Sequence, residues 1–447
     1  MSVIELGELA SSPGPEPDDA PTPGFDRRLV RQVAIAALTA FTLLAVTGSV
    51  VPEPRGVRPL WSVPVREQDG VTLGAESAFL TRTDDDVTRI TGYDLATGRV
   101  LWERDVRGSV GWVQQVRDGE MLLLPGNRQV AQFDQGSEEV IATEFHRETT
   151  ALDARTGAEL WRTAGEPHTA DTDSILLAEH TDQGRINRLR LVRATDGGTI
   201  WAKAITNVEN QVVGLLDNRP HRLVTASPTG EITVFRYADG ALISRAKVPW
   251  VTARPEEGYF NDLAVAGDYL VMNQSRRERV DQVVYRLDTM TEQWRANKTD
   301  GYGFFCGDDL LCLNQGSGIV AREIANGRPR WEIESSGNLF PLTDDRLLAD
   351  TGMDDGNPSL VDAATGRLVG APVEGSTVWN IEVDDAVLLL RPTMTPVGRT
   401  MILRWDLADG RQRLLGSIES QTAQRCQAVP KYLACYRESG LYITGVG

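Results

Sequence analysis

The chain has 447 residues, with 46 Lys and Arg against 63 Asp and Glu, and a formal net charge of −17. A chain this acidic lacks the cationic surface that phosphate contacts need, so nucleic acid is not expected as a partner. Hydrophobic residues make up 41% of the chain, which is enough for a folded core and excludes wholesale disorder. Only four Cys and four His are present, which leaves little material for a metal cluster.

The first 52 residues predict a tail followed by a membrane anchor. Residues 1–28 are Pro-rich and acidic, which is typical of a disordered segment. Residues 29–52 predict one transmembrane helix, because the run from Gln32 to Pro52 has no charge and would span about 30 Å as a helix. Arg27, Arg28 and Arg31 precede this run. The positive-inside rule therefore predicts a single-pass protein of the cell membrane, with a cytoplasmic N-terminus and the rest of the chain exported.

Two alternatives to this anchor stay open. The apolar run could be a cleaved signal peptide, although the long acidic region before it is unlike a short basic leader. It could also be a buried helix of a soluble domain, although it has no polar face. No Cys follows the run closely, so a lipid anchor is not expected.

After a linker at 53–57, a repeat predicts an all-β fold. The segments 90–106, 149–165 and 318–334 each contain an alternating strand, a tight turn ending in Gly, and a strand with Trp four residues after that Gly. This Trp position recurs from Trp61 onward about every 44 residues, which suits the four-stranded blade of a β-propeller. It is occupied at Trp61, Trp102, Trp161, Trp201, Ser244, Trp294, Trp331, Gly370 and Leu414.

Each blade is expected to have strands A to D, with an acidic A–B turn and a Gly-containing C–D turn. Asp residues such as Asp344 and Asp345 recur at the same turn of successive blades, so we interpret them as turn caps rather than as catalytic acids or Ca²⁺ ligands. The propeller is predicted to cover residues 58–447. The lone first strand, 58–65, would complete a last blade formed by 425–446, which makes nine blades.

This pattern resembles the quinoprotein-type (PQQ-like) β-propeller repeat, which builds quinoprotein alcohol dehydrogenases and the non-enzymatic BamB-like assembly factors. The repeat's signature is A-x-D-x-x-T-G-x-x-x-W, and Ala151, Asp153, Thr156, Gly157 and Trp161 match it fully. Relatives of this kind typically have eight blades. The resemblance implies that the small first residue leaves room for the Trp of a neighbouring blade. The expected blade-docking residues are Trp102, Ala151, Gly157, Trp161, Trp201, Trp294, Ala321, Gly327 and Trp331.

The chemistry of the quinoprotein enzymes is not expected to accompany the resemblance. Those enzymes use an adjacent Cys–Cys pair, and this chain has none. We therefore predict no catalytic residues, no cofactor and no metal site. The four His, at positions 146, 168, 180 and 221, form no HExxH-type pair and are interpreted as solvated loop residues.

The four Cys predict two local disulfide bonds. Cys306 and Cys312 flank one A–B turn, and Cys426 and Cys435 flank another. Two such bonds fit an exported domain. A Cys₄ zinc site, which would need the two hairpins to converge, and reduced core thiols are the alternatives.

The candidate binding surface is the face that carries the B–C and D–A connections, because the variable loops lie there. The longest, 126–148, lengthens the Trp interval, and 250–260 and 275–281 add further loop residues. Aromatic and Arg side chains on irregular loops make good interface anchors. The candidates are Arg128, Phe133, Phe145, His146, Trp250, Tyr259, Arg276, Arg277 and Arg279. As an alternative, these are solvated loops or 126–148 is an extra hairpin without a partner.

These observations favour a membrane-tethered, extracytoplasmic propeller that acts as a non-catalytic scaffold. Its partner would be another envelope protein, a peptide or a cell-wall component. One alternative is an enzyme: a PQQ-dependent quinoprotein-like dehydrogenase, or a hydrolase with a site in the propeller channel. Another is a sensor whose acidic tail reports to a cytoplasmic partner.

Overall fold

The computed structural model describes Gln32 and most of residues 56–447. Within the latter range, 86, 109, 111, 135–139, 217–218, 255–256, 278, 300, 308, 316–317, 335–337, 351–356, 381–384 and 438–439 are not described. The predicted tail and the predicted anchor at 29–52 lie outside the described residues, apart from Gln32, which is helical. In the part of the chain that is described, no helix is long and apolar enough to cross a membrane.

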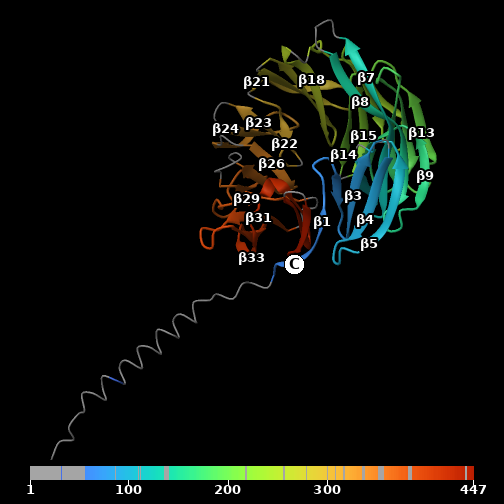
Figure 1. Ribbon diagram of the computed structural model, residues 1–447. Helices are drawn as coiled ribbons and strands as arrows, with labels where there is room; N and C mark the ends of the chain where they lie inside the picture. The colour runs from blue at the N-terminus through green and yellow to red at the C-terminus, as the bar shows by residue number, and fades with distance from the viewer. Residues whose placement is uncertain are drawn as a thin grey trace, which may run out of the picture. The chain divides into compact units, whose positions relative to one another are not determined.

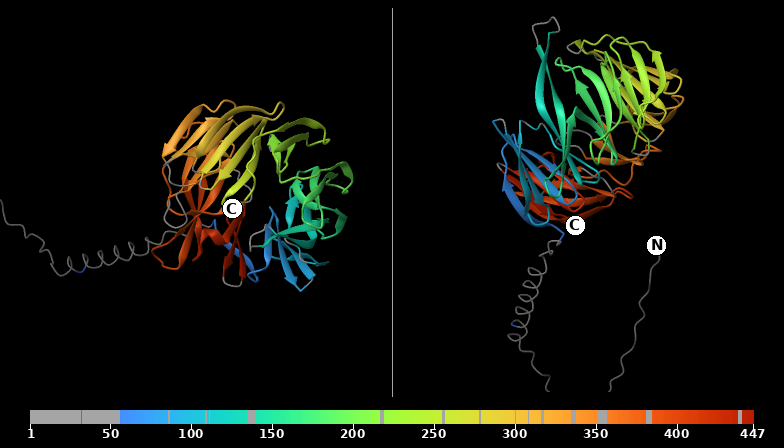
Figure 2. Two further views of the ribbon diagram at one scale, coloured as in Figure 1. Left: turned by 90° about the horizontal axis from the view of Figure 1, so that it is seen from above. Right: turned by 90° about the vertical axis from the view of Figure 1, so that its right-hand side faces the viewer.

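The unit at residues 54–447 is built almost entirely of antiparallel strands, which confirms the predicted all-β fold. Its described strands form eight sheets, one of which has eight strands and consists of two four-stranded halves. The nine resulting units, here called blades 1 to 9, are arranged around a common centre (Figures 1 and 2). Blades 1 to 8 contain three or four strands each, whereas blade 9 has five and alone combines strands from both ends of the unit.

Blades 1 to 3 have four strands each. Their strands are β2 (Gly70–Leu73), β3 (Ser77–Asp84), β4 (Val87–Asp94) and β5 (Val100–Arg107); β6 (Gln114–Val116), β7 (Met121–Asp134), β8 (Val140–Asp153) and β9 (Glu159–Ala164); and β10 (Glu166–Ala170), β11 (Ser174–His180), β12 (Ile186–Arg193) and β13 (Thr199–Ala204).

Blades 4 to 6 also have four strands each. Their strands are β14 (Asn210–Leu216), β15 (Arg219–Ala226), β16 (Glu231–Arg236) and β17 (Leu242–Lys247); β18 (Tyr259–Ala266), β19 (Tyr269–Arg276), β20 (Arg279–Arg286) and β21 (Thr291–Thr299); and β22 (Phe304–Phe305), β23 (Leu310–Gln315), β24 (Gly318–Glu323) and β25 (Pro329–Glu334). One parallel bridge, between Leu215 and Ala266, joins blades 4 and 5.

Blades 7 to 9 are less regular. Their strands are β26 (Asn338–Thr343), β27 (Arg346–Asp350) and β28 (Ser359–Asp362); β29 (Ser376–Thr377), β31 (Ala386–Pro392), β32 (Arg399–Asp406) and β33 (Gln412–Glu419); and β30 (Trp379–Asn380), β34 (Cys426–Val429), β35 (Tyr432–Arg437), β36 (Gly440–Gly445) and β1 (Arg58–Pro64), with the 3₁₀ helix η2 (Ala423–Arg425) before β34. The predicted D strand of blade 7 is reduced to one bridge, Val361–Leu368, since Gly370 and Pro372 interrupt it.

The two ends of the unit meet in blade 9. Strand β1 pairs antiparallel with β36, from Arg58 opposite Gly445 to Pro64 opposite Gly440, and Figure 1 shows β1 beside the C-terminal strands. This pairing gives the outer edge of β36 a partner, so the ring has no open seam at this position.

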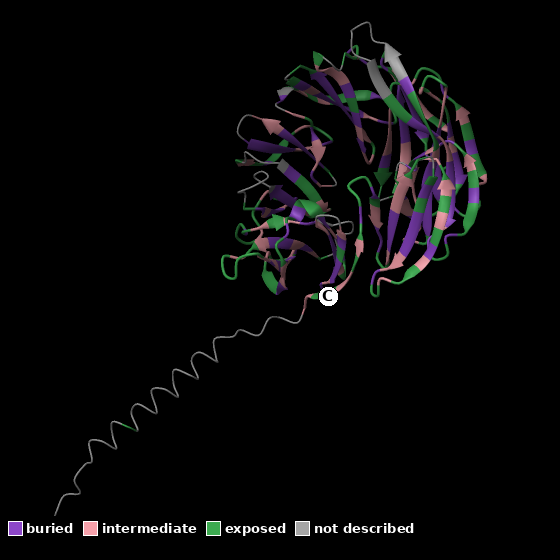
Figure 3. Cartoon of the chain, viewed as in Figure 1, coloured by how far each residue is buried: buried purple, intermediate pink, exposed green. Residues whose placement is uncertain are grey.

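The core lies between the blades. In the described residues, each of nine hydrophobic clusters joins two consecutive blades, and the ninth joins Leu441 and Ile443 of blade 9 to Leu73 and Leu80 of blade 1. Figure 3 shows the buried residues running along the blades. Strand alternation buries one residue in two toward each neighbouring blade, so every sheet has two packed faces.

Two faces of the ring are distinguished by the connections they carry. The turn face has the A–B and C–D turns: in blade 2, Ala154 N donates to Glu120 O at 2.9 Å across it. The loop face has the B–C and D–A connections: Ser420 N donates to Gly398 O at 2.9 Å across it. The chain enters the ring on the turn face, because Arg58 pairs with Gly445 at the end of β36, which is strand C of blade 9.

Candidate functional site

The turn face consists of repeated, self-capped turns. In blade 2, the Asp153 carboxylate accepts hydrogen bonds from Thr156 N at 2.8 Å and Thr156 Oγ1 at 2.7 Å. The pairs Asp94–Thr97 and Asp362–Thr365 repeat this geometry. These carboxylates are occupied in closing their own turns. Throughout the described part of the chain, no group of three His, Cys, Asp or Glu could hold a metal ion.

A Trp of one blade docks on the C–D turn of the next. Trp102 Nε1 donates to Ala154 O at 2.9 Å, and its ring lies against Gly157, where an added Cβ would come within 2.6 Å. Gly157 has φ +70°, so the turn and the ring both require glycine. The same donor–carbonyl bond joins Trp61 to Leu95, Trp161 to Ala194, Trp201 to Tyr237, Trp294 to Ile324, and Trp331 to Ala363. The Trp61 bond closes the ring from blade 9 to blade 1.

The small first residue of the motif has a different neighbour from the one expected. Ala151 pairs across the strands with Trp161 of its own blade, and Ala321 pairs likewise with Trp331. An added Cβ at Gly92 would come within 2.9 Å of its own partner, Trp102. The expectation that this position receives a neighbouring blade's Trp is therefore wrong. The turn glycine receives that ring, because the Trp side chain points out of its own sheet toward the next blade.

The junctions without Trp are joined in other ways. Ser244 Oγ donates to Leu287 O, so a short side chain makes the bond that Trp makes elsewhere. Met290 takes the glycine position of that turn with φ +53°, since no indole occupies the space beside it. At the next irregular junction, Gly370 and Gly410 bring their backbones together, with a would-be Cβ of Gly370 lying 3.2 Å from Gly410 Cα.

The two predicted disulfide bonds are confirmed. Cys306 bonds Cys312 and Cys426 bonds Cys435, each across the A–B turn of its own blade. All four Cys are buried and none is free. The zinc and free-thiol alternatives are therefore excluded for these residues.

The longest connection on the loop face is a hairpin. A loop was expected at 126–148, but strands fill most of this segment. Strand β7 continues beyond the blade as far as Asp134, and β8 begins at Val140. Arg128 and Glu144 form an exposed ion pair across this hairpin. Phe133 lies in β7, and its side chain is outside the description. Figure 1 shows the hairpin extending beyond the neighbouring strands.

Phe145 and His146 are buried, with exposed fractions of 2% and 5%, so the prediction that they are surface anchors is wrong. The hairpin leans on blade 3, which covers these side chains. The Phe145 ring lies 5.1 Å from the His180 ring, centroid to centroid. The Arg147 guanidinium lies over the Phe145 ring and donates to His180 O at 2.7 Å. The hairpin is therefore braced against the next blade.

A His–Glu cluster lies at this brace and comprises His146, Glu166 and His180. His146 Nδ1 lies 2.9 Å from Glu166 Oε1, and His180 Nε2 lies 3.9 Å from Glu166 Oε2. Burial lowers the pKa of His180 below its ordinary value. Burial alone would raise the pKa of Glu166, but hydrogen bonds from His146 bring it below the ordinary value. The interpretation of His146 and His180 as solvated is wrong, because the hairpin and blade 3 enclose them, whereas the His168 side chain is exposed.

The loops 250–260 and 275–281 meet at an Arg–Tyr corner. The Tyr259 ring lies between two guanidinium groups, with Arg254 at 4.7 Å and Arg277 at 5.9 Å from its centroid. Arg276 lies 3.6 Å from Asp281, and Arg279 is exposed at the start of β20. The structure therefore brings together the four candidates Tyr259, Arg276, Arg277 and Arg279.

Trp250, the remaining candidate, packs partly against the core between blades 4 and 5. Its Nε1 donates to Glu209 Oε2 at 3.3 Å. Burial raises the pKa of Glu209 above its ordinary value. This Trp therefore contributes to the junction of the blades as well as to the loop face.

A cavity of about 720 Å³ opens between blades 8 and 9 on the loop face. It is lined by Gly398, Glu419, Ser420, Gln421, Thr422, Arg425, Tyr436, Arg437 and Tyr442. The adjoining B–C loop carries Met394 and Val397 with exposed fractions of 90% and 87%. The cavity was not predicted, because its residues are spread over four segments whose spacing follows no known motif.

Comparison with known proteins identifies the repeat. A family model described as "Outer membrane protein assembly factor BamB" matches residues 49–294 and 145–369, which together make up more than half of the chain. The chain belongs to this family. The match confirms the resemblance to PQQ-like propeller proteins. No curated protein sequence matches the chain.

Solved structures similar to this BamB-family chain are distant in sequence. A eukaryotic initiation factor is 11% identical, with a TM-score of 0.53 over 81% of this chain and 90% of that one. BamB from Moraxella catarrhalis is 13% identical, with a TM-score of 0.41 over 87% of this chain and 99% of that one. The dihydro-heme d1 dehydrogenase NirN is 15% identical, with a TM-score of 0.42 over 67% and 65%. At 11% identity, the similarity to the eukaryotic initiation factor shows a shared fold and nothing about function.

The loop face of this BamB-family chain therefore has three distinct features: the braced hairpin, the Arg–Tyr corner and the cavity. Sequence reasoning found the first two segments but missed the cavity and the clustering of the His. The sequence did contain one signal for the cavity region. Pro and Gly around Met394 and Val397 indicate a turn, and apolar side chains that are exposed in a turn do not help to close it, so they point to a contact surface.

Proposed function

We propose that this BamB-family chain is a membrane-tethered, extracytoplasmic propeller that binds another envelope protein through its loop face. The observation that carries the proposal is the contrast between the two faces. The turn face repeats one self-capped geometry, whereas the loop face has a braced hairpin, an Arg–Tyr corner and a cavity beside exposed Met394 and Val397. Irregular connections on a rigid scaffold are where binding residues concentrate.

The tether rests on the sequence. The uncharged run from Gln32 to Pro52 and the preceding Arg27, Arg28 and Arg31 support an anchor with a cytoplasmic N-terminus. The chain enters the propeller on the turn face. The two disulfide bonds support an oxidising, extracytoplasmic location.

A scaffold is favoured over the quinoprotein-like dehydrogenase by the cysteines. The enzymes of that class hold their quinone beside an adjacent Cys–Cys disulfide, whereas all four Cys here are already paired inside two hairpins. A cell-wall component as the partner and a sensor role for the acidic tail are further alternatives.

In-cell photo-crosslinking tests the proposal. The photo-reactive residue is placed in the full-length membrane protein at exposed loop-face positions, Arg277 and Val397. The matched control positions, Arg155 and Ala238, are exposed on the turn face. Crosslinks to a second envelope protein from the loop face and not from the turn face are expected. Crosslinks confined to the turn face would move the site there.

Two further measurements test the location and the enzyme alternative. A reporter fused after Gly447 should be active only outside the cytoplasm, and protection of that terminus from protease in spheroplasts would contradict the tether. Purified protein supplied with PQQ and Ca²⁺ should not reduce dyes with alcohols or sugars. Turnover above a heat-inactivated control would favour the dehydrogenase instead.

A further inference from the structure

The B–C loop of blade 8 is unusually apolar for its exposure. Met394 and Val397 are 90% and 87% exposed, which are the largest values among the large hydrophobic residues that the structure describes. Single exposed apolar residues are common on protein surfaces, but these two lie three positions apart in one loop. The same loop ends at Gly398, which lines the cavity between blades 8 and 9. Val397 is therefore the chain neighbour of a residue that lines the cavity, and Met394 lies in the same loop.

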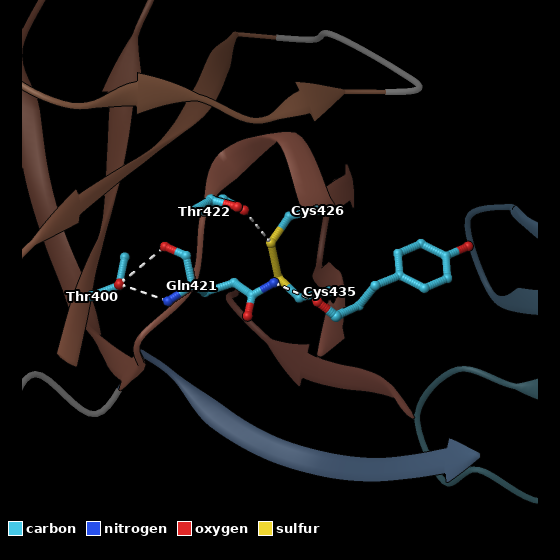
Figure 4. Close-up of a disulfide and its surroundings, with 6 residues drawn as sticks. Thr400, Gln421, Thr422, Cys426 and Cys435 are labelled. Atoms are coloured by element: carbon cyan, nitrogen blue, oxygen red, sulfur yellow. Dashed lines mark hydrogen bonds between the residues drawn. A yellow bond between two sulfur atoms is a disulfide. The ribbon is translucent and has the colours of Figure 1, made fainter. Parts of the chain in front are cut away.

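The floor of the cavity is held rigidly. Gln421 is buried and held by two hydrogen bonds. Its backbone N donates to Thr400 Oγ1 at 3.0 Å, and its side-chain Nε2 donates to Tyr436 O at 2.7 Å. The Cys426–Cys435 disulfide bond, shown in Figure 4, joins β34 to β35. Two residues of the cavity lining are the chain neighbours of these cysteines: Arg425 precedes Cys426, and Tyr436 follows Cys435. A ligand would thus meet positioned side chains and would not have to order them first.

The charged residues of the cavity are two Arg and one Glu. Arg437 stacks on Tyr442, with its guanidinium carbon 4.1 Å from the ring centroid, and pairs with Glu419. Arg425, at the end of η2, is exposed, and its guanidinium makes no ion pair or hydrogen bond with the residues that the structure describes. The lining therefore offers a free guanidinium to an anion in a protein whose net charge is −17.

We propose that this cavity binds an acidic–apolar segment of the partner protein. A Glu or Asp carboxylate of that segment pairs with Arg425 and reaches Arg437, and an adjacent bulky apolar side chain covers Met394 and Val397. Guanidinium groups bind carboxylates with two parallel hydrogen bonds, which gives direction as well as affinity. This inference rests on the proposed function and names the chemistry of the partner segment.

A peptide is favoured over a cell-wall glycan by the same geometry. Sugars bind proteins largely by stacking on open aromatic faces, and the Tyr442 face is already covered by Arg437. The exposed Met394 and Val397 have no role toward a hydroxyl-rich ligand, whereas they complete a site for an apolar side chain.

Peptide binding to the purified full-length protein in detergent micelles tests the inference. The probe is a fluorescein-labelled peptide, Gly-Ser-Leu-Glu-Phe-Asp-Leu-Ser-Gly, and its matched control has Gln and Asn in place of Glu and Asp. The acidic peptide should bind about tenfold more tightly, since one charge-assisted pair contributes about 1.4 kcal/mol. Arg425→Gln should abolish this preference, and Met394→Ser should weaken both peptides.

An exposed Arg on the turn face provides the control: Arg155→Gln should bind like the unchanged protein. Unchanged thermal unfolding of each variant separates loss of binding from loss of fold. Equal binding of the acidic and amide peptides, binding of neither, unchanged binding by Arg425→Gln, or displacement of the peptide by soluble peptidoglycan fragments overturns the inference. If crosslinking from Arg277 still captures an envelope protein in that case, the proposed function stands and only the cavity assignment fails.

Discussion

The docking of Trp rings on turn glycines makes a quantitative prediction at Gly157. Replacement by Ala adds a methyl group at φ +70° and places it 2.6 Å from the Trp102 ring. The left-handed backbone costs about 1–2 kcal/mol for a residue with a Cβ. Forcing an extra methyl group into a packed contact costs about 1–3 kcal/mol more. Gly157→Ala should therefore lower the free energy of unfolding by about 2–5 kcal/mol.

Gly267 is the matched control. It also has positive φ, +51°, but an added Cβ would meet nothing within 4 Å. Gly267→Ala should cost only the backbone share, about 1–2 kcal/mol. The difference between the two variants isolates the contact of the ring with the turn. The junction of Ser244 with the turn at Met290 agrees with this reasoning. Ser244 replaces the Trp there, and a residue with a Cβ, Met290, occupies the glycine position of the turn.

Urea unfolding followed by Trp fluorescence is the appropriate assay. The thermal midpoint of a unit of this size, residues 54–447, should move by only about 1 °C per kcal/mol, so it is a poor measure of small differences. Equal destabilisation by Gly157→Ala and Gly267→Ala would refute the reasoning, since the ring would then contribute nothing to the glycine requirement.

Three further predictions concern the hairpin, the disulfide bonds and the response to pH. Phe145→Ala should lower the free energy of unfolding by about 3–5 kcal/mol, whereas Val130→Ala, on the same hairpin but 53% exposed, should change it by less than about 0.5 kcal/mol; equal effects in urea unfolding would show that the brace is unimportant. Cys426→Ser should cost about 2–3 kcal/mol by the loop-entropy relation, and an unchanged urea midpoint would contradict the stabilising role of the bond. Because burial lowers the pKa of His180, the unfolded state takes up the proton first, so stability should be full above about pH 6.5 and fall as the pH decreases below it. His180→Gln should reduce the dependence of the urea midpoint on pH between 7.5 and 5.5, and an unchanged dependence would assign it elsewhere.

The sequence determined the repeat and its ends. The interval between Trp positions and the Gly–Trp spacing specify a strand, a turn and a second strand wherever they recur, because turn geometry and strand alternation depend on neighbouring residues alone. The same local logic paired Cys306 with Cys312, since the two residues flank one hairpin. It also matched the lone strand at 58–65 with a last blade that lacked one.

Contacts between blades could be read only from the tertiary structure. The sequence does not show that Trp102 reaches Gly157 of the next blade, or that Ala151 faces Trp161 of its own, because both depend on the direction in which a side chain leaves its sheet. The same reason explains the error at Phe145 and His146. In an irregular connection they have the sequence of exposed anchors, and the position of blade 3 buries them.

The His–Glu cluster and the cavity show the same division. His146 and His180 are 34 positions apart, and the cavity combines Gly398 with Tyr442. The spacing of residues along the chain carries no information on such pairs, because they come into contact only when consecutive blades pack against each other in the closed ring. The sequence by itself determined the blades, their turns and their covalent links. The tertiary structure decided which loop side chains are covered by a neighbour and which remain available to a partner, since burial is a property of the packed ring.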